Sequence, residues 1–151
     1  MINYLISLIM ILVSGYSYSQ EKIYFESSNP FSFKDIIKNT NLQLNQNVYG
    51  ILRTPKDFNN SDKYPVIIAV AGSNGWSDHH FAYLELYRDN GIVTFELYSF
   101  ISRGIESTVG TQVEVTTAMM ILDAYQALDT LIELPYVNSE KIGITGWSLG
   151  G

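Results

Sequence analysis

The chain has 151 residues, of which 46% are hydrophobic and 16% are charged, and its formal net charge is −6. This is the composition of about one globular domain, and it excludes an intrinsically disordered protein, which would have fewer apolar residues. The acidic balance and the lack of a Lys/Arg cluster argue against a nucleic-acid partner. The sequence has no cysteine, which excludes disulfides, thiolate metal sites and a cysteine nucleophile.

The first residues have the pattern of a signal peptide. Residues 4–13 are apolar apart from Ser7, and about ten residues are too few to cross a bilayer but suit the apolar core of a leader. We therefore expect a signal peptide over residues 1–19, cleaved between Ser19 and Gln20. The mature protein would be periplasmic or extracellular, with no stable membrane span. An uncleaved anchor or a buried strand is the alternative.

Several elements can be predicted along the next part of the chain. Residues 21–46 are polar and Asn-rich, so we expect an irregular segment with at most one short strand. In the segment Asn47–Pro55 apolar and polar residues alternate well enough to predict a strand. The run Val66–Ala71 is continuously apolar, as in a strand buried on both faces. Residues 78–90 carry apolar side chains at three-residue intervals, which predicts a helix that Gly91 ends.

The remaining elements continue the alternation of strand and helix. Ile92–Leu97 predicts a second buried strand. Thr111 and Glu114 have the spacing of a capping box, which predicts the start of a long helix ending near Pro135. Asp123, inside this helix, is expected to be solvated. The apolar stripe of the helix is Val115, Ala118, Leu122, Tyr125, Leu128 and Ile132.

A third buried strand is predicted at "KIGITGW", residues 141–147. The order of elements then predicts an α/β fold with a mainly parallel sheet, in which ligands bind at the carboxyl ends of the strands.

Residues 146–150, "GWSLG", match the pattern G-x-S-x-G. Alone the match is weak, since a chain this long contains one by chance roughly 5% of the time. Here, however, a predicted strand leads directly into Ser148, which is the context in which the motif presents a nucleophile. Gly146 and Gly150 would give clearance to the sharp turn. An ordinary Gly-rich turn is the alternative.

A serine nucleophile also needs an oxyanion hole made of two N–H donors. The candidates are the backbone N–H of Leu149 and that of Ser73, which lies in the loop "AGSNGW" after the first buried strand. A turn without chemistry is the alternative for this loop. Arg103 is a candidate contact for a substrate carboxylate, the alternative being that it holds its own loop together.

Other residues near these loops have weaker claims to a role. His79 and His80 are expected to be first-turn helix residues, because a general base must lie within about 3 Å of the serine oxygen. Glu96, at the end of its strand, is a lesser candidate for substrate contact. Trp147 is expected to pack under the elbow, the sharp turn at residues 146–150.

Taken together, residues 64–108 and 136–151 resemble the α/β-hydrolases of the dienelactone hydrolase family, near the prolyl-oligopeptidase-like esterases. The buried strand, the oxyanion loop, the "SFISRG" segment and the elbow occur in the family's order, and the resemblance covers roughly Val48–Gly151. It implies a three-layer α/β-hydrolase fold and a triad of Ser or Cys with Asp and His. It also implies no cofactor, no metal, and a small-molecule ester, lactone or related acyl substrate.

The sequence departs from the family pattern in three ways. Ser148 stands where dienelactone hydrolase proper has cysteine, and the oxyanion loop begins Ala71-Gly72 rather than His-Gly. In this fold the acid and then the histidine follow the nucleophile, so both are expected beyond Gly151. Residues 20–151 would then be the N-terminal part of a serine hydrolase domain, truncated after the elbow. By itself it would be inactive and poorly soluble, with the elbow strand as an exposed apolar edge.

Two classes of alternative stay open. The first is a non-catalytic binding or interaction protein that has the same fold. The second, within enzymes, is a prolyl-oligopeptidase-like peptidase or an acyltransferase.

Overall fold

The computed structural model describes residues 19–39 and 45–151, so the predicted signal peptide lies outside the described residues. The strands are β1 (Gln20–Ser28), β2 (Asn45–Arg53), β3 (Tyr64–Val70), β4 (Val93–Leu97) and β5 (Val137–Gly146). The α-helices are α1 (Phe33–Asn39), α2 (Asp78–Asp89) and α3 (Thr117–Ile132). Two short 3-10 helices are η2 (Ile101–Arg103) and η3 (Ser148–Gly150).

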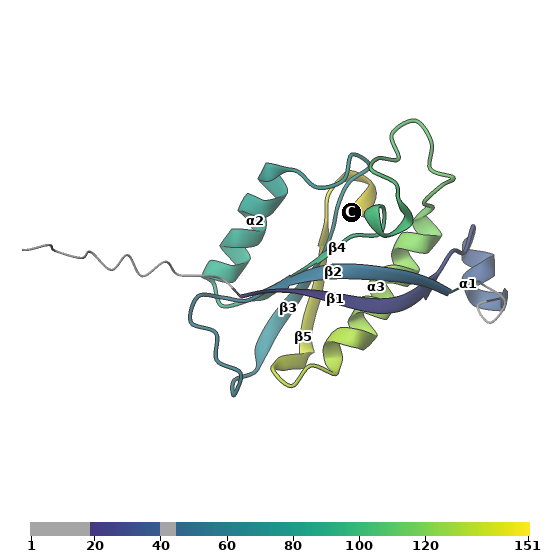
Figure 1. Cartoon of the computed structure of the whole chain (residues 1–151). Coiled ribbons are helices and arrows are strands. Elements are labelled where there is room, and N and C mark those ends of the chain that lie inside the picture. The colour runs from purple at the N-terminus through teal and green to yellow at the C-terminus, as the bar shows by residue number, and fades with distance from the viewer. Residues whose placement is uncertain (1–18, 40–44) are drawn as a thin grey trace, which may run out of the picture.

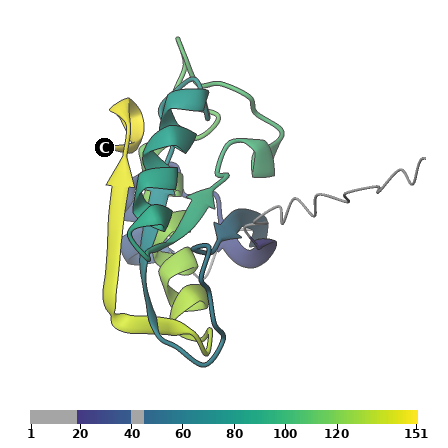
Figure 2. The same ribbon diagram turned by 90° about the vertical axis from the view of Figure 1, so that its left-hand side faces the viewer.

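The five strands form one sheet in the order β1-β2-β4-β3-β5 (Figure 1). The three strands predicted as buried, β4, β3 and β5, run parallel to one another, while β1–β2 and β2–β4 are antiparallel pairs. The sheet is therefore mixed, with a parallel half that carries the elbow. Helices α2 and α3 lie on opposite faces, as right-handed crossovers in opposite directions require. Figure 2 shows β5 and η3 along one side of the molecule.

The N-terminal region is more regular than its composition predicts. Strand β1 pairs with β2 along its whole length of nine residues, and α1 follows it. Phe25 of β1 is buried and its ring centroid lies 6.4 Å from that of Phe95 in β4. The expectation of an irregular segment is wrong because distant partners, β2 and α3, stabilise the strand and leave little local signal.

The predicted start of the long helix is also wrong. Thr111 and Glu114 are exposed and precede α3, which begins after Thr116. The Thr116 hydroxyl accepts the N–H of Met119 at 3.2 Å, as an N-cap does. It also donates to the carbonyl of Pro30 at 2.9 Å, a tertiary contact that fixes where the helix begins.

Part of the predicted stripe of α3 faces the core. Val115, Ala118 and Leu122 are buried, but Tyr125 and Ile132 are 64% and 40% exposed. The first of these, Tyr125, borders an apolar groove of about 380 Å³ between α3 and β5.

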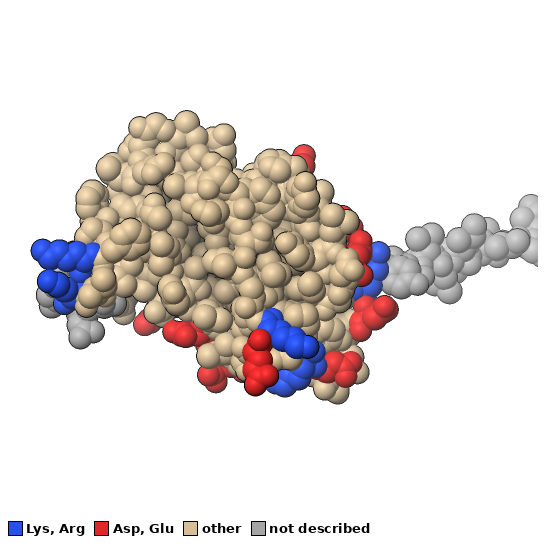
Figure 3. All heavy atoms as spheres, turned by 180° about the vertical axis from the view of Figure 1, so that it is seen from behind, with Lys and Arg blue, Asp and Glu red and all other residues tan. Residues whose placement is uncertain are grey.

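Within the described residues β5 pairs with β3 alone, so the expected apolar edge strand is confirmed. Figure 3 shows a broad face on which charged side chains gather mainly along the lower edge.

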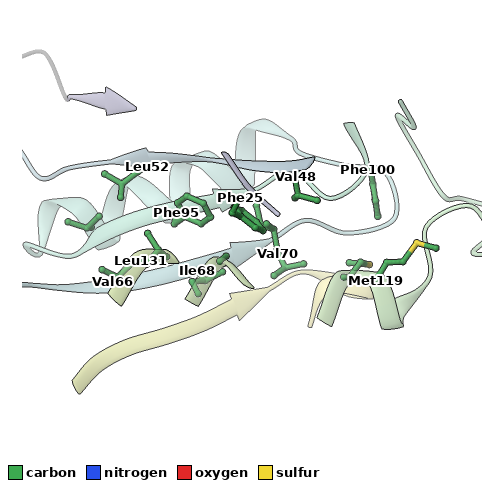
Figure 4. Close-up of a cluster of buried hydrophobic side chains, with 14 of the residues drawn as sticks. Phe25, Val48, Leu52, Val66, Ile68, Val70, Phe95, Phe100, Met119 and Leu131 are labelled. Carbon is green, nitrogen blue, oxygen red and sulfur yellow. The ribbon is translucent and has the colours of Figure 1, made fainter. Parts of the chain in front are cut away.

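The core lies between the sheet and α3 (Figure 4). Phe95 is fully buried at its centre and packs directly over Gly50 of β2, where an added Cβ would overlap the phenyl ring. Val66 and Leu52 are buried beside it. This packing fixes β3 and β4 side by side, and their carboxyl ends carry the loops described next.

Candidate active site

Ser148 lies at the turn between β5 and η3, and its side chain is exposed. Its φ is +53°, which makes it the one non-glycine residue with a positive φ in the described ranges. The left-handed conformation costs an L-residue roughly 1–2 kcal/mol, and strain of this kind clusters at functional sites. A strained, exposed serine directly after a parallel strand has the geometry of a nucleophile elbow.

The two glycines of the motif let the elbow pack tightly on β3. A Cβ added to Gly146 would overlap the carbonyl group of Gly150. A Cβ added to Gly150 would lie 2.5 Å from the carbonyl oxygen of Val70 and 2.6 Å from that of Ala71. The backbone N–H of Trp147 also donates to the Val70 carbonyl at 3.2 Å. Larger residues at either glycine would push the serine away from the end of β3.

The loop after β3 reaches the elbow. Gly72 and Gly75 close a tight turn through a 2.9 Å hydrogen bond, and Gly75 has a φ of +75°. A Cβ added to Gly72 would lie 3.3 Å from the Cβ of Ser148, so the loop lies close beside Ser148. The carbonyl of Ser73 accepts the N–H of Thr108 at 2.8 Å, which anchors the loop.

The two predicted oxyanion donors have no competing acceptor among the described residues. Neither the N–H of Ser73 nor that of Leu149 makes a hydrogen bond with any residue that the structure describes. Both groups belong to segments that the contact between Gly72 and Ser148 brings together. Their role toward a substrate oxygen stays a prediction.

The histidines lie in the first turn of α2, as predicted. His80 is buried, and its Nδ1 accepts the N–H of Ser77 at 3.2 Å. Burial lowers the pKa of His80, and the neighbouring His79 lowers it further. The His80 ring lies 4.5 Å from that of Trp147, which is half-buried between α2 and the elbow. In the described ranges neither histidine hydrogen-bonds to Ser148.

Arg103 holds its loop to the rest of the fold. Its Nε donates to Asn29 at 2.7 Å, and its two terminal nitrogens donate to Asp123 at 2.7 and 3.0 Å. They also donate to the carbonyls of Ser99 and Ser28, both at 2.9 Å. All five guanidinium N–H groups are therefore used. These bonds favour the alternative that Arg103 holds its own loop together, since a substrate carboxylate would have to displace one of them.

The expectation that Asp123 is solvated is wrong. Asp123 is fully buried, binds Arg103 through both oxygens and accepts the hydroxyl of Ser27 at 2.6 Å. Glu96 is also fully buried, and it pairs with Arg53 at 2.9 Å rather than reaching the surface. Desolvation raises the pKa of Glu96, although the arginine charge beside it opposes the shift.

A cavity of about 250 Å³ opens beside the oxyanion loop, at the carboxyl ends of β3 and β4. The sequence predicted the position of such a site but not its walls, which come from the loops after both strands. Ser148 is not one of its lining residues, but Ala71 is, and the next residue, Gly72, contacts the elbow. The aromatic, amide and carboxylate residues among those that line the cavity are Asn74, Trp76, Tyr98, Phe100 and Glu106.

The described residues offer neither a metal-binding cluster nor a membrane-spanning helix. They contain no cluster of His, Cys, Asp and Glu side chains that could hold a metal ion. None of the helices in those same ranges is long and apolar enough to cross a membrane.

No protein-family model and no curated protein matches the sequence. Several solved structures, in contrast, are similar to this chain. Dipeptidyl peptidase 4 from Porphyromonas gingivalis matches 88% of this chain with 18% of its own (20% identity, TM-score 0.54). The acylaminoacyl peptidase of Pyrococcus horikoshii matches 88% with 20% of its own (17% identity, TM-score 0.58). A dienelactone hydrolase-like promiscuous phosphotriesterase from metagenomic libraries matches 87% with 50% of its own (15% identity, TM-score 0.56).

The chain has the α/β-hydrolase fold. The predicted fold class and the resemblance to dienelactone hydrolase-like proteins and prolyl-oligopeptidase-like enzymes are thereby confirmed at the level of fold. The chain spans only 18–50% of the length of these three neighbours. All three are hydrolases by name.

Proposed function

We propose that the protein carrying this α/β-hydrolase chain is a serine hydrolase of ester, lactone or related acyl bonds, with Ser148 as its nucleophile. The observation that carries the proposal is the left-handed φ of +53° at Ser148, in a turn packed against Gly72. A structural serine has no reason to hold a conformation that costs roughly 1–2 kcal/mol. The hydrolase names of the structural neighbours support the same reading.

The chemistry follows from the two segments in contact. The Ser148 oxygen attacks the carbonyl carbon of the substrate while a base accepts the hydroxyl proton, and the C=O electron pair moves onto the oxygen. The N–H groups of Ser73 and Leu149 would stabilise that oxyanion, each contributing about 2.7–4 kcal/mol in comparable sites. The intermediate then expels the alcohol, which takes the proton, and water releases the acyl group from the serine.

The base is proposed to lie outside the 151 residues. Neither His79 nor His80 hydrogen-bonds to Ser148 within the described residues, and both make hydrogen bonds to Ser77 instead. In this fold the acid and the histidine follow the nucleophile in the chain. We place both beyond Gly151, and the 151-residue chain is then inactive alone. The signal-peptide pattern at residues 1–19 supports action outside the cytoplasm, and we propose that the substrate is a small molecule.

The proposal is tested by labelling the full-length protein with a fluorophosphonate probe. We expect covalent labelling of wild-type protein and none of the Ser148→Ala variant. Ser139→Ala is the matched control, because Ser139 is exposed near the start of β5, away from the elbow. A folded full-length protein that does not react with the probe would refute the proposal and favour a non-catalytic binding protein. Sequencing the gene downstream of the Gly151 codon tests separately for an acid followed by a histidine.

A further inference from the structure

The cavity beside the oxyanion loop has walls suited to an organic cation. Trp76, Tyr98 and Phe100 line it, and Glu106 is the one residue with a charged side chain among its lining residues. Aromatic faces and carboxylates both attract ammonium groups. We propose that this cavity binds the alkylammonium part of a cationic ester substrate, with Glu106 at its rim. The inference rests on the proposed hydrolase function and names the substrate class.

The aromatic residues of the cavity are held in place by neighbours. The indole N–H of Trp76 donates to the carbonyl of Leu97 at 3.3 Å, and its ring stacks on Phe81 with centroids 5.5 Å apart. The ring of Tyr98 stacks on Tyr49 at 5.0 Å with an interplanar angle of 13°. Rings fixed before the ligand arrives lose little entropy on binding, which favours recognition of a small group.

The charge of the cavity is not neutralised from within the fold. Burial, with Glu96 next in effect, raises the pKa of Tyr98 to about 12, so its phenol is neutral. The Glu106 carboxylate forms no ion pair or hydrogen bond with any residue in the described ranges. Arg103 lies in the same loop, but all its N–H groups are bound elsewhere. A cation that balances Glu106 must therefore come from outside these residues.

The size and place of the cavity suit one part of a substrate. Its volume of about 250 Å³ is below the roughly 300–1,000 Å³ of sites that enclose a whole drug-sized ligand. Val70 and Ala71 line it, and the Val70 carbonyl accepts the N–H of Trp147, the residue before Ser148, at 3.2 Å. An ammonium group bound there can be joined by a short linker to an ester carbonyl at the elbow.

The test compares two esters of equal shape in the full-length protein. Acetylcholine carries a quaternary nitrogen where 3,3-dimethylbutyl acetate carries a carbon. We expect kcat/KM to favour the cationic ester by at least about fivefold. Glu106→Gln should lower that ratio by roughly two- to fivefold, an effect that shrinks in high salt. Glu140→Gln, the same change in an exposed residue near the amino end of β5, lies roughly 20 Å from Gly146 along the strand and should leave the ratio unchanged.

Equal kcat/KM values for the two esters would overturn the inference while leaving the hydrolase function intact. If neither ester is hydrolysed, the fluorophosphonate labelling decides about the proposed function, and ligand binding decides about the cavity. For this the Ser148→Ala variant is titrated with tetramethylammonium chloride, and with sodium chloride as the control, while its tryptophan fluorescence is followed. A saturable change that Glu106→Gln weakens supports the inference, and the absence of a saturable change overturns it.

Discussion

The strain at Ser148 can be measured by comparing two substitutions that both remove the hydroxyl. Ser148→Ala keeps the Cβ in the left-handed region at a φ of +53°, whereas Ser148→Gly removes it. Relief of the strain is worth roughly 1–2 kcal/mol. Glycine also lowers the free energy of unfolding by about 0.4–1 kcal/mol, because it makes the unfolded chain more flexible. We therefore expect Ser148→Gly to be the more stable variant by about 0.5–1 kcal/mol.

The assay is urea-induced unfolding of both variants in the full-length protein. Equal slopes of the free energy of unfolding against urea concentration would show that the unfolded states are comparable. The Ser148 side chain is exposed and makes no hydrogen bond within the described residues, where only the backbone carbonyl of Ser148 is bonded. Its loss in Ser148→Ala should therefore cost less than about 0.5 kcal/mol. A Ser148→Gly variant no more stable than Ser148→Ala would refute the reasoning, because the turn would then hold no strain for a function to explain.

Two further pairs of substitutions test the remaining structure by unfolding. Asp123→Ala should lower the free energy of unfolding by about 3–5 kcal/mol, because it leaves Arg103 buried without its counter-ion; Asp129→Ala, exposed on the same helix, should change it by less than about 0.5 kcal/mol. Thr116→Ala should cost about 1 kcal/mol if Thr116 is the N-cap, while Thr111→Ala should cost almost nothing; the reverse order would restore the predicted helix start.

The raised pKa of Glu96 adds a prediction about pH. Glu96 holds its proton more tightly in the native state than in the unfolded state. Its favourable contribution to the stability of the fold is therefore complete below pH 4.5 and is lost as the pH rises through the native pKa. The stability of wild type relative to Glu96→Gln should thus fall as the pH rises above 4.5. A difference that stays constant with pH would contradict this, and one that grows would mean that the pairing with Arg53 outweighs burial.

Local signals in the sequence identified most of the elements that carry the site. The continuous apolar run at Val66–Ala71 and the three-residue spacing in residues 78–90 are properties of neighbouring residues, so the strand and the helix could be read directly. The G-x-S-x-G pattern at residues 146–150 gave the place of the turn for the same reason. Each of these features is encoded within a few residues of itself.

Features that depend on distant partners could not be read in this way. Asp123 looked like a surface residue because its partners, Arg103 and Ser27, lie 20 and 96 residues away. The start of α3 was misplaced because Thr116 is held by a contact with Pro30 across 86 residues. A pattern search weighs only neighbours along the chain, and a buried polar residue shows its character only through the groups that surround it.

Periodicity and turn residues act over short distances, so the alternation of strands and helices and the glycine-flanked serine could be predicted from the residues alone. Long-range packing fixes the rest: Gly72 lies beside the elbow, Ser148 is held at a positive φ, and Arg103 binds Asp123. These facts depend on how β3 and β5 pack against each other. That packing is set by contacts between segments more than seventy residues apart in the chain.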